Sequence, residues 1–227
     1  MPETVFTFWE GEMPAYIKLC MQTWKFPYVL LNYNNFHKYT SFDISGVKRF
    51  TLPQIADCVR VHVLRDQGGY WLDTDTIMFQ DSLPISDFIG NIEVRSPTIG
   101  YLHTEAHSEV YQKWAEYQDS VIADPNSKTH WDIMGNAFID KYAREHPELT
   151  FANTSEFHPE HAIPYHMSNQ LKYKEFYFEK SYPFKSIPRT YMLMLHNSWT
   201  PSWYKELNEQ EVLEYDCTLS NILRGLL

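Results

Sequence analysis

The sequence contains no segment with the features of a membrane span or a secretion signal. None of its apolar runs approaches the roughly 20 residues that cross a bilayer as a helix. The N-terminus also lacks a basic segment followed by an apolar stretch of about 7–15 residues and a cleavage site. We therefore expect a cytoplasmic protein, and peripheral contact with the inner face of a membrane stays open.

Cysteine is scarce, with only Cys20, Cys58 and Cys217 in 227 residues. The number is odd, the spacing is wide, and no CxxC pattern occurs. These features favour reduced thiols in a core over a disulfide framework or a zinc knuckle.

Positive charge is also in short supply. The chain has 19 Lys+Arg against 29 Asp+Glu, which gives a formal net charge of -10. Nucleic acids and anionic lipids are attracted by a positive field, so the balance argues against bulk attraction to either. An acidic protein that holds a diphosphate needs local help, for which a bound divalent cation is well suited. The 44% hydrophobic and 16% aromatic content suffices for the core of one domain.

The first 31 residues alternate between strand and helix patterns. Thr4–Trp9 is rich in residues that favour strands, Pro14 opens a segment with apolar residues at helical spacing, and Tyr28–Leu31 is apolar again. We predict a βαβ unit here. Such units are typical of α/β folds, whose ligands bind at the carboxyl ends of the strands.

The clearest helix start is at Thr51, where a Thr N-cap is followed three residues later by Gln54, with proline in the first turn. We expect this helix to run to about Gln67 and to end at Gly68-Gly69, because glycine adopts a left-handed conformation at low cost. A short strand over Tyr70–Leu72 should follow.

Further elements are predicted from apolar spacing and composition. A strand is expected over Thr98–Leu102, helices over Glu109–Val121 and Trp131–Arg144, loops over Phe151–Pro188, a strand over Tyr191–Leu195, and a closing helix over Glu209–Leu227.

Two features of this part have open interpretations. Met134-Gly135-Asn136 falls at the centre of a predicted helix, where glycine costs about 1 kcal/mol against alanine. It marks either close approach to a ligand or tight packing. His158, His161 and His166 suggest a zinc cluster, but their irregular spacing and the absence of a nearby cysteine favour polar loop residues.

Asp73 and Asp75 directly follow the predicted Tyr70–Leu72 strand. Residues two apart point to the same side of an extended chain, so the two carboxylates can converge. Hard oxygen ligands suit Mg²⁺ or Mn²⁺, which would bridge a diphosphate and stabilise the leaving group. An arbitrary D-x-D pair more often caps a strand. The position at the mouth of a buried strand favours the metal-binding interpretation.

Asp57 and Arg60 lie three apart, hence on one face of the preceding helix. They form either a surface ion pair or a polar stripe that holds a sugar. In the second case Asp57 accepts hydrogen bonds from hydroxyls, and Arg60 donates to hydroxyls or orients a carboxylate.

The whole run from Leu52 to Asp75 resembles the DXD-containing sugar-binding region of retaining glycosyltransferases related to capsular polysaccharide synthesis proteins and yeast-type α-mannosyltransferases. More distantly it is similar to the clostridial glucosylating toxins. The matching positions are Asp57, Arg60, Gly68, Gly69, Asp73 and Asp75. Two positions depart from the family pattern, Ala56 replacing the usual Ser and Trp71 standing where Tyr is common.

Two flanking segments strengthen the resemblance. The opening F-T-F-W looks like the family's first strand, which implies donor binding by Phe8 and by Trp9, stacked on the base. Each is otherwise a core aromatic. The closing H-N-S-W-T-P-S-W looks like a segment that reaches over the donor diphosphate. The resemblance implies metal ligation by His196 and donor contacts from Asn197, Ser202 and Trp203.

The resemblance implies a GT-A type α/β domain, with a mixed sheet flanked by helices and a small C-terminal helical and loop extension. We expect one domain over residues 1–227, with a donor-binding part over about 1–100 and an acceptor and closing part over about 101–227. Asp75 should be the main metal ligand, with Asp73 serving the donor as well as the metal.

The implied activity is transfer of a sugar from a UDP- or GDP-sugar to a saccharide hydroxyl, with Mn²⁺ or Mg²⁺ and retention at the anomeric carbon. The acceptor could be lipid-linked, and Phe151–Phe184 is the segment expected to contact it. Two alternatives stay open, a metal-dependent phosphotransferase or hydrolase and a catalytically silent carbohydrate-binding protein. The oligomeric state is also open.

Overall fold

A computed structural model describes residues 3–91, 95–127, 130–153, 170–184 and 191–227. Contacts between residues divide the chain into two compact units. The first unit comprises Met1–Glu10, Pro27–Asp73 and Ile85–Asn153, and the second comprises Gly11–Phe26, Thr74–Pro84 and Thr154–Leu227. The prediction of a single domain over 1–227, with parts over about 1–100 and 101–227, stays a prediction.

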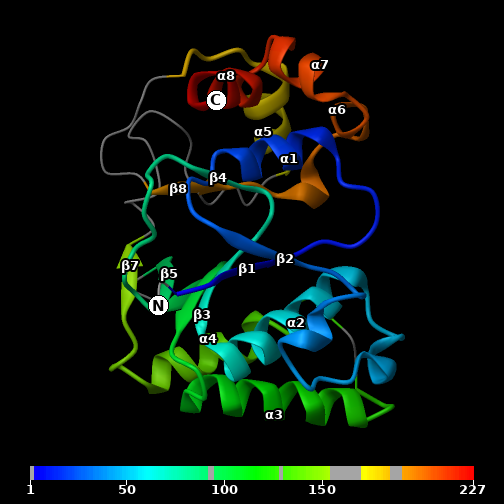
Figure 1. The fold of residues 1–227 in the computed structure, drawn as a ribbon, viewed down its shortest axis with the longest axis vertical. Helices are drawn as coiled ribbons and strands as arrows, with labels where there is room; N and C mark the ends of the chain where they lie inside the picture. The colour runs from blue at the N-terminus through cyan, green and yellow to red at the C-terminus, as the bar shows by residue number, and fades with distance from the viewer. Residues whose placement is uncertain (1–2, 92–94, 128–129, 154–169, 185–190) are drawn as a thin grey trace. The chain divides into compact units, whose positions relative to one another are not determined.

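The first unit contains a six-stranded mixed sheet (Figure 1). Its strand order is β2-β1-β3-β6-β5-β7. The strands are β1 (Val5–Phe8), β2 (Tyr28–Leu31), β3 (Gly69–Leu72), β5 (Phe88–Asn91), β6 (Ser96–Thr104) and β7 (Phe151–Asn153).

Strand direction changes within this sheet. β1 pairs in parallel with both β2 and β3, and β6 is antiparallel to both β3 and β5. The predicted strands over Thr4–Trp9, Tyr28–Leu31, Tyr70–Leu72 and Thr98–Leu102 are therefore confirmed, as is the parallel crossover from β1 to β2. The connecting helix α1 (Ala15–Gln22) lies in the second unit, where it contacts β4, α6 and α7.

The helix α2 (Leu52–Gln67) begins and ends where the sequence predicted. Thr51 and Gln54 form a capping box, and the Gln54 Oε1 accepts from the Thr51 backbone N–H at 2.9 Å. Gly68 ends the helix with φ 65°. A Cβ at this position would lie 2.4 Å from the Ala106 backbone nitrogen, so the termination depends on glycine.

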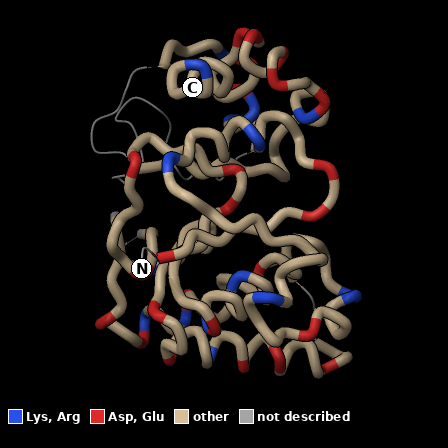
Figure 2. The backbone as a smooth tube through the Cα atoms, in the orientation of Figure 1, with Lys and Arg blue, Asp and Glu red and all other residues tan. Residues whose placement is uncertain are grey.

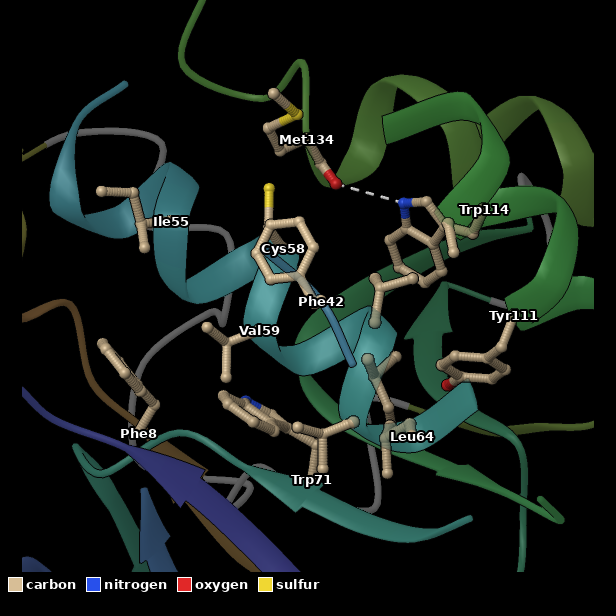
Figure 3. Close-up of a cluster of buried hydrophobic side chains, with 14 of the residues drawn as sticks. Phe8, Phe42, Ile55, Cys58, Val59, Leu64, Trp71, Tyr111, Trp114 and Met134 are labelled. Atoms are coloured by element: carbon tan, nitrogen blue, oxygen red, sulfur yellow. Dashed lines mark hydrogen bonds between the residues drawn. The ribbon is translucent and has the colours of Figure 1, made fainter. Parts of the chain in front are cut away.

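Three helices pack together on the sheet in the first unit (Figure 1). α2 contacts β1, β3 and β6, α4 (Asn136–Glu145) contacts β6, and α3 (Glu109–Ala123) contacts α2 and α4. Figure 3 shows the apolar core between α2 and its neighbours, including Val59, Trp71 and Trp114. This mixed sheet with flanking helices is an α/β, GT-A-like arrangement, as predicted.

The predicted helix over Trp131–Arg144 is wrong in its first part, because α4 begins at Asn136. Gly135 has φ -114° and ψ -106°, which is not helical. A Cβ there would come 2.4 Å from the Ile99 Cδ1 and 3.2 Å from the Asp57 Oδ2. Gly135 is therefore not in the middle of a helix but precedes it, and it packs against β6 and α2.

The second unit is built from a two-stranded antiparallel sheet and short helices. The strands are β4 (Thr76–Met78) and β8 (Met192–Met194). The helices are α1, α5 (Gln170–Lys174), the π-helix η4 (Glu175–Glu179), η5 (Asn197–Trp199), α6 (Ser202–Lys205), α7 (Glu209–Glu214) and α8 (Thr218–Leu226). β8 confirms the strand predicted over Tyr191–Leu195.

Two further predictions are corrected. The closing helix is two helices, because Tyr215 is extended and the Thr218 N–H is held by the Lys180 carbonyl at 2.7 Å. The segment Phe151–Pro188, predicted as loops, contains β7, α5 and η4. Tyr173 of α5 and Tyr177 of η4 are both buried and lie four residues apart, on one face. His158, His161, His166 and the rest of 154–169 lie outside the described residues.

All three cysteines are free and buried. Across the described ranges, no helix combines the length and the apolar character needed to cross a membrane. Acidic and basic residues are interspersed along the trace of each unit (Figure 2).

Candidate functional site

Two predicted site residues of the first unit, Asp57 and Asp73, meet around Arg60, which projects from α2. The Arg60 Nη2 lies 2.8 Å from the Asp73 Oδ1 and 3.4 Å from the Asp57 Oδ1. The second guanidinium nitrogen, Nη1, donates to the Ile99 carbonyl. Asp57 and Arg60 are buried, so the interpretation as an exposed surface pair does not hold. We call Asp57, Arg60 and Asp73 the Arg60 group.

Asp73 is positioned by its own backbone and by Trp71. Its N–H donates to the Gly100 carbonyl at 2.9 Å, which continues the β3–β6 ladder. The indole Nε1 of Trp71 donates to the Asp73 Oδ1 at 2.8 Å, and the Arg60 guanidinium lies 5.1 Å from the centre of the Trp71 ring. One carboxylate oxygen thus receives two donors, while the side chain stays 35% exposed.

The pKa of Asp57 is raised to about 7, because burial disfavours the carboxylate more strongly than the Arg60 guanidinium favours it. The negative charge of Asp73 raises it further. Asp57 therefore titrates near neutral pH, where a carboxyl group can either donate or accept a hydrogen bond. Gly135 lies so close to this carboxyl that a Cβ there would come 3.2 Å from the Asp57 Oδ2.

Phe8 and Trp9 end the first strand at different depths. Phe8 is 7% exposed and belongs to the core (Figure 3). Trp9 is half-buried, and its N–H donates to the Leu31 carbonyl at 3.0 Å. Their predicted contact with a nucleotide base stays a prediction.

Asp75 lies in the second unit and is bound to the segment after β8. Its Oδ2 accepts from the Asn197 N–H at 2.9 Å, and its carbonyl accepts from the Leu195 N–H at 3.1 Å. The backbone bond extends the β4–β8 pairing by one step. The sequence-distant Asp75 and Asn197 are therefore direct partners.

Two buried tyrosines fix the same segment. The Tyr16 hydroxyl donates to the Asn197 Oδ1, and the Tyr173 hydroxyl accepts from the His196 N–H at 3.0 Å. The His196 ring lies 4.3 Å from the Trp199 ring. Desolvation lowers the pKa of His196, which favours the neutral ring that a metal ion requires as a ligand. We call Asp75, His196, Asn197 and Tyr16 the Asp75 group.

Ser202 and Trp203 begin α6 and are exposed. The Trp203 ring lies 4.9 Å from the Tyr215 ring and 39% of the residue is accessible to solvent. Both side chains are therefore open to a ligand.

No group of three or more His, Cys, Asp or Glu side chains gathers as a metal site in the described part of the chain. The Asp73 Oδ1 accepts hydrogen bonds from Arg60 and Trp71, and the Asp75 Oδ2 accepts one from the Asn197 N–H. Metal binding by Asp75, Asp73 and His196 stays a prediction.

Sequence reasoning missed the structural roles of three aromatic residues. Trp71 was noted only as a departure from the family pattern, and Tyr16 and Tyr173 carry no motif. Tyr16 lies on the buried face of α1, where apolar spacing indicates packing and gives no sign of a hydrogen bond 181 residues along the chain.

A family model described as capsular polysaccharide synthesis protein matches residues 1–217. No curated protein matches the chain.

Proposed function

The chain belongs to the capsular polysaccharide synthesis protein family, and we propose that it is a glycosyltransferase that moves a sugar from a nucleoside diphosphate sugar to a saccharide hydroxyl. The observation that carries this proposal is the Arg60 group. A guanidinium held between two carboxylates, with one carboxylate oriented by an indole N–H, offers the fixed donors and acceptors that sugar hydroxyls require.

In this proposal the Arg60 group binds the donor's sugar. Asp57 and Arg60 hold the hydroxyls of the transferred sugar, and Asp73 accepts from a hydroxyl of the sugar or the ribose. The two donors on the Asp73 Oδ1 support this role, because they fix the carboxylate plane and leave Oδ2 as its remaining acceptor.

The Asp75 group is proposed to bind the diphosphate with Mn²⁺ or Mg²⁺. Such ions are often held by only one or two carboxylates together with substrate phosphates, so a cage of three protein ligands is not required. Asp75 and a neutral His196 are suitable donors for an ion that arrives with the nucleotide. When bound, the ion would neutralise charge on the leaving diphosphate. Asn197, Ser202 and Trp203 would donate hydrogen bonds to the diphosphate.

Among the described residues, the carboxylates of Asp57 and Asp73 are paired with the Arg60 guanidinium. This pairing suits stabilisation of charge better than covalent attack by a carboxylate. The resemblance implies transfer with retention, and we propose that the leaving phosphate accepts the acceptor's proton. The proposed donor is a UDP- or GDP-sugar whose base stacks on Trp9. The saccharide acceptor could be lipid-linked.

The test is turnover on a panel of UDP- and GDP-sugars with Mn²⁺, with release of nucleoside diphosphate as the readout. We expect release for at least one donor and its loss on chelation. The absence of both binding and release across the panel would refute the proposal.

Product analysis separates the two alternative functions. A hydrolase or phosphotransferase would liberate or transfer phosphate, whereas a glycosyltransferase leaves the diphosphate intact. A silent carbohydrate-binding protein would bind sugar with no turnover, and its affinity would survive Asp75→Asn.

A further inference from the structure

The short segment His130-Trp131-Asp132, which precedes α4, exposes a large aromatic side chain. Trp131 is 79% exposed, although an indole has a large apolar surface that is usually buried. By contrast, Trp71 on β3 and Trp114 on α3 of the same unit are at most 1% exposed. The exposure of Trp131 therefore calls for a physical reason.

The backbone around Trp131 is held on both sides, so its exposure does not come from a frayed end. The Gln54 side-chain amide donates to the His130 carbonyl at 2.8 Å. Ile133 and Met134 are buried, and the Met134 carbonyl accepts from the Trp114 Nε1 at 3.1 Å (Figure 3). The indole is presented to solvent from a fixed support.

Polar side chains flank the ring in the sequence. The His130 Nδ1 is hydrogen-bonded to the Asp132 Oδ1, and the side chains are 55% and 30% exposed. An exposed aromatic ring, flanked in the sequence by an imidazole and a carboxylate, supplies the kinds of group that bind a pyranose, which has an apolar C–H face and a rim of hydroxyls.

The same segment continues into the Arg60 group. The Gly135 N–H donates to the Asp132 carbonyl at 3.0 Å, and a Cβ on Gly135 would lie 3.2 Å from the Asp57 Oδ2. The chain thus passes from Trp131 to the carboxyl of Asp57 within four residues. Trp131 is therefore only four residues along the chain from the glycine that packs against Asp57.

We propose that His130, Trp131 and Asp132 form a subsite for a pyranose ring of the saccharide acceptor. This inference rests on the proposed function. The C–H face of the sugar stacks on the Trp131 indole, and its hydroxyls bond to the His130 imidazole and the Asp132 carboxylate. In this proposal the Gly135 end of the segment, which packs against Asp57, faces the transferred sugar.

The test compares Trp131→Ala with Tyr28→Ala, a matched change at an aromatic that is 40% exposed on β2 of the same unit. Donor hydrolysis into water is measured first without acceptor, and transfer is then measured with a panel of p-nitrophenyl hexosides. Binding of the same hexosides is followed separately without donor. Both variants should fold, since each removes an exposed side chain.

We expect Trp131→Ala to raise the acceptor KM by about tenfold or more, with donor KM and donor hydrolysis unchanged. Trp131→Tyr should retain most of the acceptor affinity, and Tyr28→Ala should match the wild type. Unchanged acceptor KM in Trp131→Ala, or no hexoside binding by the wild type, overturns the subsite. A wild type that neither binds nor cleaves any donor instead overturns the proposed function.

Discussion

Replacing Trp71 with phenylalanine isolates the hydrogen bond that orients Asp73. Phenylalanine keeps an aromatic ring beneath the Arg60 guanidinium but removes the indole N–H that lies 2.8 Å from the Asp73 Oδ1. A hydrogen bond to a charged group contributes about 1.5–3 kcal/mol. Asp73 is 35% exposed and keeps its bond to Arg60, so the low end applies, and donor affinity should fall roughly tenfold.

Trp114→Phe is the matched control for this change. Trp114 is fully buried in the same unit, and its Nε1 donates to the Met134 carbonyl, which also receives the Gln118 amide at 2.6 Å. Both variants lose an indole N–H and a similar buried volume, so their melting temperatures should fall by similar amounts. A loss of 1 kcal/mol corresponds to roughly 2–4 °C in a chain of this size.

The assay is calorimetric titration of each variant with the donor identified by the turnover panel, together with thermal melts. Trp71→Phe should weaken donor binding, and Trp114→Phe should leave it unchanged. Equal weakening in both variants, or wild-type affinity in Trp71→Phe, would show that Trp71 serves only packing.

Three further predictions concern Asp75, Asp57 and Gly135. Asp75→Asn keeps an acceptor for the Asn197 N–H, so it should abolish turnover while the melting temperature changes little, as measured by nucleoside diphosphate release and thermal melts. The stability of Asp57→Asn relative to the wild type should increase as the pH rises from about 4 to 7, as measured by denaturant titration. The reason is that the raised native pKa of Asp57 makes the wild type lose stability as the pH rises through that range. Gly135→Ala should lower the melting temperature by several degrees, and Ile99→Val should restore part of it by removing the Cδ1 that lies 2.4 Å from the new Cβ.

Each of these has an outcome that contradicts it. Turnover by Asp75→Asn would remove Asp75 from the reaction. A stability difference between Asp57→Asn and the wild type that is constant with pH would mean that the native pKa of Asp57 is not raised. Independent effects of Gly135→Ala and Ile99→Val in the double variant would mean that the two side chains do not meet.

Local chemistry determined the elements that the sequence alone could locate. The start of α2 follows from the Thr51 and Gln54 capping box and its end from glycine at positive φ, both of which act within a few residues. The strands around it are marked by apolar and aromatic composition. The same short range placed Asp57 and Arg60 on one face of a helix and Asp73 at the end of β3.

Long-range contacts decided the rest. The helix pattern before α4 fails because Gly135 packs against Ile99 and Asp57, which are distant in sequence. The division of the D-x-D pair was also invisible to spacing. Asp73 is tied to Arg60 and Trp71 in the first unit, whereas Asp75 is tied to Asn197 in the second. The sequence alone selected the candidate site residues. Only the tertiary structure decided that Asn197 is the partner of Asp75, because a partner more than 100 residues away leaves no periodic signal in the chain.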